Sequence, residues 1–150
     1  MCIRDSIQGF NGTDVLNGLA GDDTLDGGNG ADVLTGGLGR DVLIGGNGPD
    51  QFVFAAAGET AVGVNRDLIS DFANEDTIVL TAIDANAALA GDQAFAFIGS
   101  AAFGNVAGQL RSYVDGGTTI VAGDTNGDGM ADFEIGLSGA PVLVAGNFML

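Results

Sequence analysis

Histidine is absent from this 150-residue sequence, and its single cysteine is Cys2. Without histidine, neither a Ser-His-Asp triad nor a zinc site of the H-E-x-x-H type can form, and no other catalytic constellation is visible. A lone cysteine cannot form a disulfide within the chain. We therefore expect that this chain is not an enzyme and binds no zinc.

Basic residues are also scarce: 4 Lys and Arg stand against 20 Asp and Glu, a formal net charge of −16. No basic patch is available to meet phosphates, so a nucleic-acid partner is excluded. No apolar run is long enough to span a membrane, and no conventional secretory signal is visible. Self-repulsion of this size opposes a compact state unless cations neutralise it. Divalent cations are the obvious counter-charge; acidity that serves only solubility is the alternative.

Glycine is abundant, with 27 residues, and it is periodic. Read in steps of nine from Gly9, the chain gives GFNGTDVLN, GLAGDDTLD, GGNGADVLT, GGLGRDVLI and GGNGPDQFV. All five repeats carry Gly at positions one and four, Asp at position six and a large apolar residue at position eight. These positions are Gly9, Gly18, Gly27, Gly36 and Gly45; Gly12, Gly21, Gly30, Gly39 and Gly48; Asp14, Asp23, Asp32, Asp41 and Asp50; and Leu16, Leu25, Leu34, Leu43 and Phe52.

Each class of position has a physical reason. Positions six to nine are too short for anything but a β-strand, in which alternation turns the position-eight residue to one face. The glycine-rich half turns the chain sharply. Two repeats then make one coil, so alternate repeats stack: Asp14, Asp32 and Asp50 line one edge, and Asp23 and Asp41 the other. The sequence predicts an all-β fold with a right-handed parallel β-roll over residues 9–53.

Stacked carboxylates, at a strand spacing of roughly 4.8 Å, would repel one another. Calcium removes this repulsion because Asp carboxylates and carbonyls freed by the glycine turns together supply an all-oxygen shell. The five repeats make three same-side pairs, which predict about three calcium sites. The alternative is that Asp serves only as a turn former. The predicted metal ligands of the roll are Gly9, Asn11, Gly12, Asp14, Gly18, Gly21, Asp23, Gly27, Gly28, Asn29, Gly30, Asp32, Gly36, Gly37, Gly39, Asp41, Gly45, Gly46, Asn47, Gly48 and Asp50.

The period stops at Phe54, and residues 54–150 predict a mostly antiparallel, β-sandwich-like region. Gly116 and Gly117 predict a hairpin turn, and the Ala-rich segment 82–90 predicts a short helix. Residues 1–8 precede the period and are predicted to be a remnant or boundary segment. The predicted strands cover 67–72, 76–80, 94–98, 109–114, 118–122 and 133–135.

A second calcium motif lies between two of these strands. Asp124, Asn126, Asp128 and Asp132 have the spacing D-x-N-x-D-G-x-x-D, which matches the first nine positions of a calcium loop. Ile135 stands where an EF-hand carries Glu, and strands rather than helices flank the loop, so it is not an EF-hand. We predict a calcium loop in a β context; the alternative is a turn in which only the backbone needs these residues.

The nonapeptide GGxGxDx(apolar)x resembles the RTX (repeats-in-toxin, hemolysin-type) repeats of secreted bacterial proteins. From Gly9 onward, the layout also resembles the C-terminal part of serralysin-type zinc metallopeptidases (peptidase M10). Five pieces carry this second resemblance: Gly48-Pro-Asp50-Gln-Phe-Val-Phe54, Asp67-Leu-Ile-Ser-Asp71-Phe72, Ala94-Phe-Ala-Phe-Ile98-Gly99, Gly123 to Ile135, and Asn147-Phe-Met-Leu150.

This resemblance implies further calcium ligands at Glu59, Asp67 and Asp76. It also implies that Asn147 to Leu150 closes a signal for type I (ABC-transporter) export, with Asn147 where Asp is usual. The zinc-binding proteolytic half would lie upstream, outside this chain.

Together these features predict a secreted, extracellular module that binds several Ca²⁺ ions. It would stay unfolded at the low calcium of the cell, fold on calcium binding after type I secretion, and stabilise an upstream catalytic or effector domain. The alternative function is a structural or adhesive RTX surface protein with no enzymatic partner domain.

Overall fold

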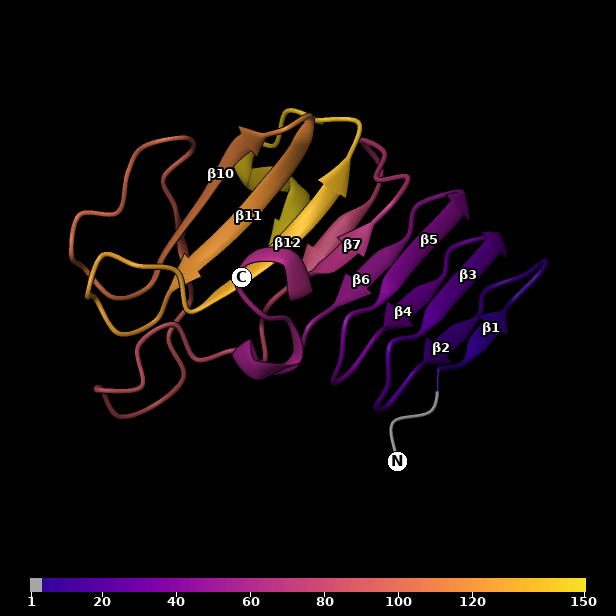
Figure 1. The fold of residues 1–150 in the computed structure, drawn as a ribbon, viewed down its shortest axis with the longest axis horizontal. Helices are drawn as coiled ribbons and strands as arrows, with labels where there is room; N and C mark the ends of the chain where they lie inside the picture. Colours follow the sequence, from indigo (N-terminus) through magenta and orange to yellow (C-terminus); the bar gives the residue numbers. More distant parts are fainter. Residues whose placement is uncertain (1–3) are drawn as a thin grey trace.

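The computed structural model describes residues 4–150 as two β-sheets that share one hydrophobic core (Figure 1). One sheet has the strand order β1-β3-β5-β7-β12-β11-β10-β9, and the other has the order β13-β8-β6-β4-β2. The repeats supply the strands β1 (Ser6–Gln8), β2 (Val15–Asn17), β3 (Thr24–Asn29), β4 (Val33–Thr35), β5 (Val42–Asn47) and β6 (Gln51–Val53).

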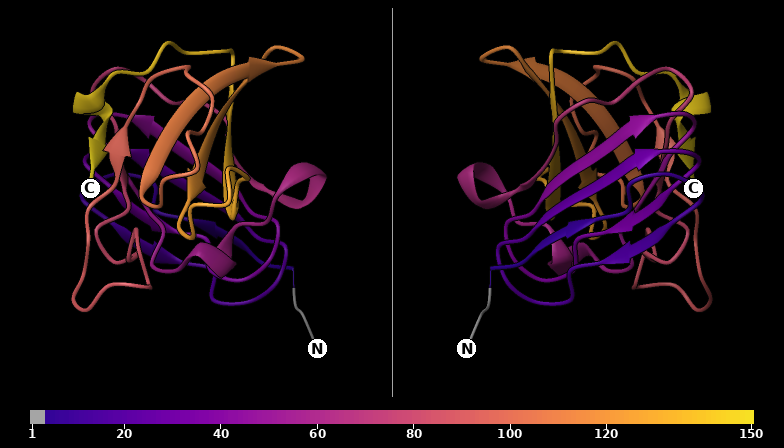
Figure 2. Two further views of the ribbon diagram at one scale, coloured as in Figure 1. Left: turned by 90° about the vertical axis from the view of Figure 1, so that its left-hand side faces the viewer. Right: turned by 90° about the vertical axis from the view of Figure 1, so that its right-hand side faces the viewer.

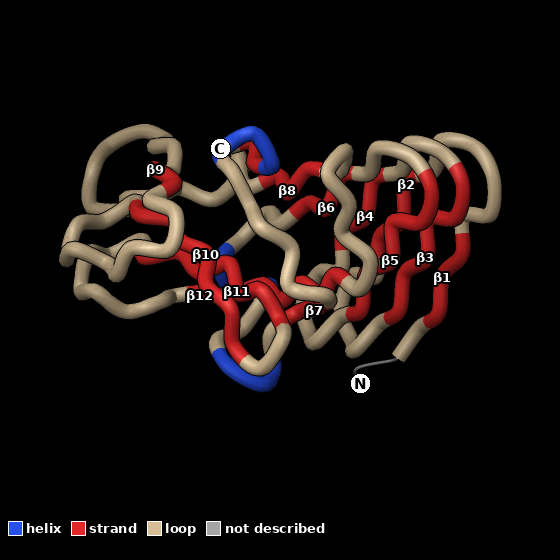
Figure 3. Tube along the Cα trace, turned by 90° about the horizontal axis from the view of Figure 1, so that it is seen from above, coloured by secondary structure: helices blue, strands red, loops and turns tan. Residues whose placement is uncertain are grey.

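Successive repeats alternate between the two sheets, so two repeats make one coil (Figure 3). Val15 is in register with Val33, and Leu25 with Leu43, both in parallel pairs 18 residues apart. The position-eight side chains Leu16, Leu25, Leu34, Leu43 and Phe52 are all buried between the sheets. The predicted parallel β-roll is therefore confirmed.

The roll is longer than the sequence period at both ends. After the repeats, β7 (Asp67–Ile69) pairs in parallel with β5, and β8 (Thr77–Val79) with β6. Before them, β1 pairs with β3 and places Asp5 and Ile7 in the register of positions six and eight. Segment 1–8, which was predicted to be a remnant or boundary segment, thus contains the strand half of a repeat. The sequence before this strand does not carry the glycines of a repeat. Residues 1–3 lie outside the described residues.

The C-terminal region extends both walls of the roll (Figure 1; Figure 2). β10 (Gln109–Asp115), β11 (Thr118–Asp124) and β12 (Phe133–Ser138) form an antiparallel meander. A parallel pair of β12 with β7 attaches the meander to the roll, and β9 (Ala96–Phe97) pairs in parallel with β10 at its other edge. In the second sheet, β13 (Phe148–Met149) pairs in parallel with β8. The predicted hairpin turn joins β10 to β11, with φ values of 57° at Gly116 and 83° at Gly117.

The predicted helix over residues 82–90 is wrong, since this segment forms turns. Asp84 Oδ1 accepts hydrogen bonds from the backbone N–H groups of Asn86 and Gln93, and Asn86 Oδ1 accepts one from Ala88. Such local side-chain acceptors compete with a helical backbone. The helices of the described chain are three short 3₁₀ turns, Ala57–Glu59, Gly63–Asn65 and Ala145–Asn147. None of the helices in residues 4–150 is long and apolar enough to cross a membrane.

Candidate calcium sites

Aspartates stack in a column along each edge of the roll. In the first column, Asp14, Asp32 and Asp50 each donate the backbone N–H to Oδ1 of the next Asp, at 2.8, 2.9 and 3.0 Å. The third of these bonds ends on Asp76, which therefore extends the column beyond the repeats. The predicted alignment of Asp14, Asp32 and Asp50 is confirmed.

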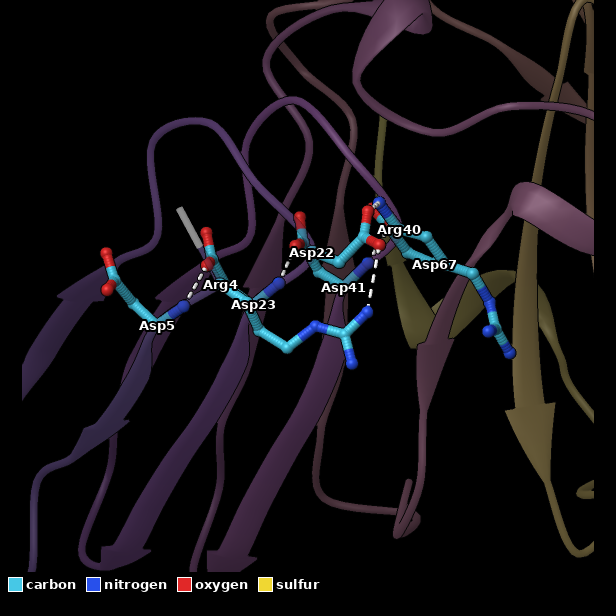
Figure 4. Close-up of polar contacts among 7 residues, drawn as sticks. All are labelled: Arg4, Asp5, Asp22, Asp23, Arg40, Asp41 and Asp67. Carbon is cyan, nitrogen blue, oxygen red and sulfur yellow. Dashed lines mark hydrogen bonds and ion pairs between the residues drawn. The ribbon is translucent and has the colours of Figure 1, made fainter. Parts of the chain in front are cut away.

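The second column runs along the other edge of the roll, and its Asp residues are drawn in Figure 4. Asp5, Asp23 and Asp41 donate their backbone N–H groups to Oδ1 of Asp23, Asp41 and Asp67, at 2.7, 2.8 and 2.8 Å. Of these four Asp residues, only Asp23 and Asp41 belong to the five nine-residue repeats. Each column thus contains four Asp residues and three stacked pairs, more pairs than the repeats alone predict.

The second carboxylate oxygen of most column residues has no partner. Among the described residues, the Oδ2 atoms of six of them are buried and accept no hydrogen bond. These are Asp14, Asp23, Asp32, Asp41, Asp50 and Asp67. Asp76 differs because its Oδ2 accepts the Ala73 N–H at 2.8 Å, which closes the first column. Since a buried charged oxygen without a partner is strongly destabilising, these six atoms fit a cation ligand set.

At Gly9, Gly18 and Gly27, the glycine at position one lets a backbone carbonyl of the next coil approach the Oδ2 atom of Asp14, Asp23 or Asp32. A Cβ atom added at Gly9 would lie 2.7 Å from Asp14 Oδ2 and 2.6 Å from the Gly27 carbonyl oxygen. At Gly18, the corresponding distances to Asp23 Oδ2 and the Gly36 carbonyl oxygen are 2.7 and 2.6 Å. Two oxygens from stacked turns therefore converge on a point that any side chain would fill. This is a physical reason for glycine at position one in every repeat.

The glycines at positions two and four bring the stacked turns into close contact. Gly28 and Gly30 have φ values of 97° and 148°, and a Cβ atom on either would overlap a carbonyl of the preceding coil, that of Phe10 or Gly12. A Cβ atom would overlap a carbonyl of the preceding coil in the same way at Gly37, Gly39, Gly46 and Gly48. In the first two repeats, Phe10 and Leu19 occupy position two at φ values of 73° and 70°.

The asparagines at position three form a ladder of their own. Asn29 Nδ2 donates to Asn11 Oδ1, and Asn47 Nδ2 to Asn29 Oδ1, both at 2.8 Å. The carbonyls of Asn29 and Asn47 accept the N–H groups of Gly12 and Gly30 at 2.8 Å. The structure therefore places these side chains against one another on the exposed turns. Their predicted role as metal ligands stays a prediction.

The chemistry of the columns suits a hard divalent cation. In the metal-free protein, burial raises the pKa of Asp67 to about 8 and that of Asp50 to about 6, and it also raises the pKa values of Asp41 and Asp76. Neighbouring carboxylates add to each of these rises. Carboxylate and carbonyl oxygens are the ligands that calcium takes. Within residues 4–150, no three or more acidic, His or Cys side chains gather in one group. Backbone carbonyls would therefore have to complete each shell.

Two further acidic residues lie next to the columns. Asp71, which sequence reasoning did not single out as a site residue, accepts the N–H groups of Gly45 and Gly46 at 2.9 and 2.8 Å and caps the last repeat. Glu59 accepts the Ala55 N–H at 2.7 Å and lines a hollow of about 350 Å³ with Asp22 and Arg40. The role of Glu59 as a ligand stays a prediction, whereas Asp67 and Asp76 lie in the columns.

The loop between β11 and β12 is held by its own hydrogen bonds. Asp124 is fully buried, and its two carboxylate oxygens accept the N–H groups of Gly127 and Gly129 at 2.6 and 2.9 Å. Asp132 Oδ2 accepts the Thr125 N–H at 2.7 Å, and Asp132 Oδ1 accepts Asn126 Nδ2 at 2.8 Å. Asp128 Oδ1 accepts the Met130 N–H. These bonds fit the turn-forming alternative, and the predicted calcium loop stays a prediction.

Comparisons with known proteins agree with this geometry. The RTX calcium-binding nonapeptide repeat, in four copies, matches residues 4–25 and 18–52. No curated protein matches the sequence. Two similar solution structures come from the Azotobacter vinelandii mannuronan C5-epimerase. The AlgE6R3 subunit is 28% identical over 97% of this chain and 78% of that chain, with a TM-score of 0.67. The AlgE6R2 subunit is 32% identical over 96% of this chain and 91% of that chain, with a TM-score of 0.58.

Proposed function

The chain belongs to the RTX calcium-binding nonapeptide repeat family, and from this premise we propose that it is a module that folds when calcium binds after export from the cell. The observation that carries the proposal is the set of six buried, unpartnered Oδ2 atoms along the two columns. In a chain of net charge −16, these carboxylates repel one another unless a cation lies between the stacked turns.

Calcium would be held by the column carboxylates together with the position-one carbonyls, such as those of Gly27, Gly36 and Gly45. When bound, it supplies the counter-charge that the metal-free roll lacks. A ligand that binds only the folded state stabilises that state by mass action, by about 2.7 kcal/mol for one site at 100 times its dissociation constant. Extracellular calcium modules typically bind at about 10⁻⁴–10⁻³ M. The same chain would therefore be unfolded in the cell and folded outside it.

The C-terminal residues support an order of events in which export precedes folding. Phe148 is buried, and the Met149 carbonyl accepts the Leu80 N–H at 2.8 Å, so residues 148–149 form the edge strand β13. If Asn147 to Leu150 closes the type I export signal, the transporter would have to recognise this segment in the unfolded chain. Folding outside the cell would then bury Asn147 and Phe148 of the signal and make export one-way.

The function of the parent protein has two candidates from different enzyme classes. The predicted one is a serralysin-like metallopeptidase with its zinc-binding half upstream. The near-complete mutual coverage with the AlgE6R2 subunit favours a second one, an enzyme that modifies a polysaccharide, since nearly the whole chain corresponds to one module of an epimerase. Reading the coding sequence upstream separates them: an H-E-x-x-H-x-x-G-x-x-H pattern supports the peptidase, and a polysaccharide-modifying catalytic domain supports the second candidate. Long further repeats would instead support the adhesive alternative.

Far-UV circular dichroism during a calcium titration of the purified chain tests the proposed function, with magnesium as the control. We expect a cooperative gain of β signal at sub-millimolar to millimolar calcium and none with magnesium. A full β spectrum in chelator at physiological salt would overturn calcium-dependent folding and reduce the aspartates to turn formers.

A further inference from the structure

Charged residues flank the second column but hardly flank the first. The residue immediately before each Asp of the second column is Arg4, Asp22, Arg40 or Arg66, so three of the four basic residues in the chain lie along this edge. The corresponding residues of the first column are Thr13, Ala31, Pro49 and Glu75. The two edges of one roll therefore carry the same carboxylates in different electrostatic surroundings.

The flanking residues of the second column contact one another along the stack (Figure 4). Arg4 Nη2 lies 3.2 Å from Asp22 Oδ2, and Asp22 Oδ1 accepts the Arg40 backbone N–H at 3.1 Å. Arg66 is ion-paired with the buried carboxylate of Glu134, which also accepts the Tyr113 hydroxyl.

Arg40 is the free charge of this edge. Its side chain is exposed and makes no ion pair with any residue of the described chain. It also lines two neighbouring hollows, one with Glu59 and one with Arg66. Position five tolerates an uncharged residue elsewhere, since Thr13, Ala31 and Pro49 occupy it on the other edge. Arg40 can therefore be neutralised without breaking an ion pair.

The charge balance differs clearly between the edges. Along the second column, the four Asp residues, Asp22 and Glu134, which is the ion-pair partner of Arg66, are opposed by three arginines, which leaves a formal charge of −3. Along the first, the four Asp residues and Glu75 meet no base, which leaves −5. Glu59 acts electrostatically on Asp41 of the second column and Asp71 on Asp50 of the first, so each edge gains one further negative charge and the difference is unchanged.

Building on the proposed function, we infer that the two edges bind calcium unequally: the first column binds tightly, and the second fills only at higher calcium. A fixed positive charge near a cation site opposes binding of a divalent ion. For a unit charge about 10 Å from the ion in a largely aqueous medium, the effect on affinity is several-fold. Arg40, the one arginine of this edge without an ion-pair partner in the described chain, therefore lowers the calcium affinity of the second column several-fold at low salt, and ionic screening reduces the effect.

Because the two columns differ in calcium affinity, the roll assembles in two steps. The first column assembles as soon as calcium reaches its tighter sites. The second column ends at Asp67, next to Arg66 and its ion pair with Glu134 in β12, so its filling completes the junction with the C-terminal sheet. The arginines neutralise part of the negative charge at this edge, so the second column fills at a higher calcium concentration than the first.

Isothermal titration calorimetry of the full chain with calcium tests the inference. Wild type is expected to show two classes of sites, the tighter lost in Asp32→Asn and the weaker lost in Asp23→Asn. Arg40→Gln should tighten the weaker class several-fold and leave the tighter class unchanged. The matched change on the other edge, Ala31→Arg, should weaken the tighter class by a similar factor.

Raising the salt concentration should shrink both shifts. If neither Arg40→Gln nor Ala31→Arg moves either class at low salt, the inference is overturned while the proposed function stands. If both variants move both classes equally, the charges act on the whole roll, and unequal edges are likewise excluded. Absence of any calcium binding by wild type would overturn the proposed function and the inference together.

Discussion

Asp41 donates its backbone N–H to the carboxylate of Asp67, 26 residues later, at 2.8 Å. This bond continues, outside the repeats, a pattern that the repeats make at intervals of 18 residues. Asp67 opens β7, which pairs with β5 of the roll on one side and with β12 of the C-terminal sheet on the other. A cation at this pair would therefore stabilise the roll and its junction with the C-terminal region together.

Replacing an Asp in the middle of a column should weaken calcium binding while keeping the hydrogen bond between stacked turns. Asp32→Asn keeps an Oδ1 acceptor for the Asp14 N–H but removes the charge of the unpartnered Oδ2. Loss of one charge-assisted contact, about 1.5–3 kcal/mol, lowers affinity roughly 10- to 100-fold. Calorimetric titration measures it, with the exposed Asp92→Asn as the control. An equal loss in both variants would show that net charge, rather than the column, binds the ions.

A side chain at position one should obstruct the oxygens that converge there. In Gly27→Ala, the new Cβ atom would lie 2.6 Å from Asp32 Oδ2 and 2.7 Å from the Gly45 carbonyl oxygen. We expect a loss of about 1–3 kcal/mol in the free energy of unfolding in calcium, the usual cost of overpacking. Gly146→Ala, which has no neighbouring atom within 4 Å, should change it by under about 0.5 kcal/mol. Chemical denaturation in saturating calcium compares them, and similar values for the two variants would refute the proposed crowding.

The metal-free chain should become less stable as the pH rises. Burial raises the pKa of Asp67 from its ordinary value of 3.8 to about 8 and that of Asp50 to about 6, so the folded state holds more protons than the unfolded state in this range. Stability from these groups is present near pH 4 and is lost as the pH approaches 8. In chelator, the folded fraction measured by far-UV circular dichroism should fall from pH 5 to pH 8, and saturating calcium should abolish the fall. A folded fraction in chelator that rises with pH would contradict this.

Removing the C-terminal aromatic side chain should destabilise the calcium-loaded fold. Phe148 is buried and packs on Phe97 with a ring-centroid distance of 4.9 Å. Phe148→Ala is expected to cost about 3–5 kcal/mol, as buried Phe-to-Ala changes do. Met149→Ala, at a half-exposed neighbour, should cost far less. Urea unfolding in saturating calcium provides the comparison. Equal stability of wild type and Phe148→Ala would mean that β13 is not part of the stable fold.

The roll and its two edges were predictable because each repeat obeys the same local rules. Gly at positions one and four, Asp at six and an apolar residue at eight specify a turn, an edge carboxylate and a buried strand residue, and a strict period then stacks them. Asp14 over Asp32 and Asp23 over Asp41 follow directly from this.

Features without a period were harder to predict from residues alone. Asp67 and Asp76 join the columns after intervals of 26 residues, which include an irregular loop, so only resemblance pointed to them. Asp5 was missed because its repeat lacks the glycine-rich half. The alternating charges before the second column, at Arg4, Asp22 and Arg40, are visible as a pattern only once the stacking order is known.

The most direct test of calcium binding by the two columns is a crystal structure of the chain grown with calcium, with anomalous scattering used to locate the ions. We predict ions between stacked turns of the roll, within about 2.3–2.6 Å of column Oδ2 atoms such as that of Asp32 and of position-one carbonyl oxygens such as that of Gly45. Ions absent from both columns, or confined to the Asp124 to Asp132 loop, would contradict it.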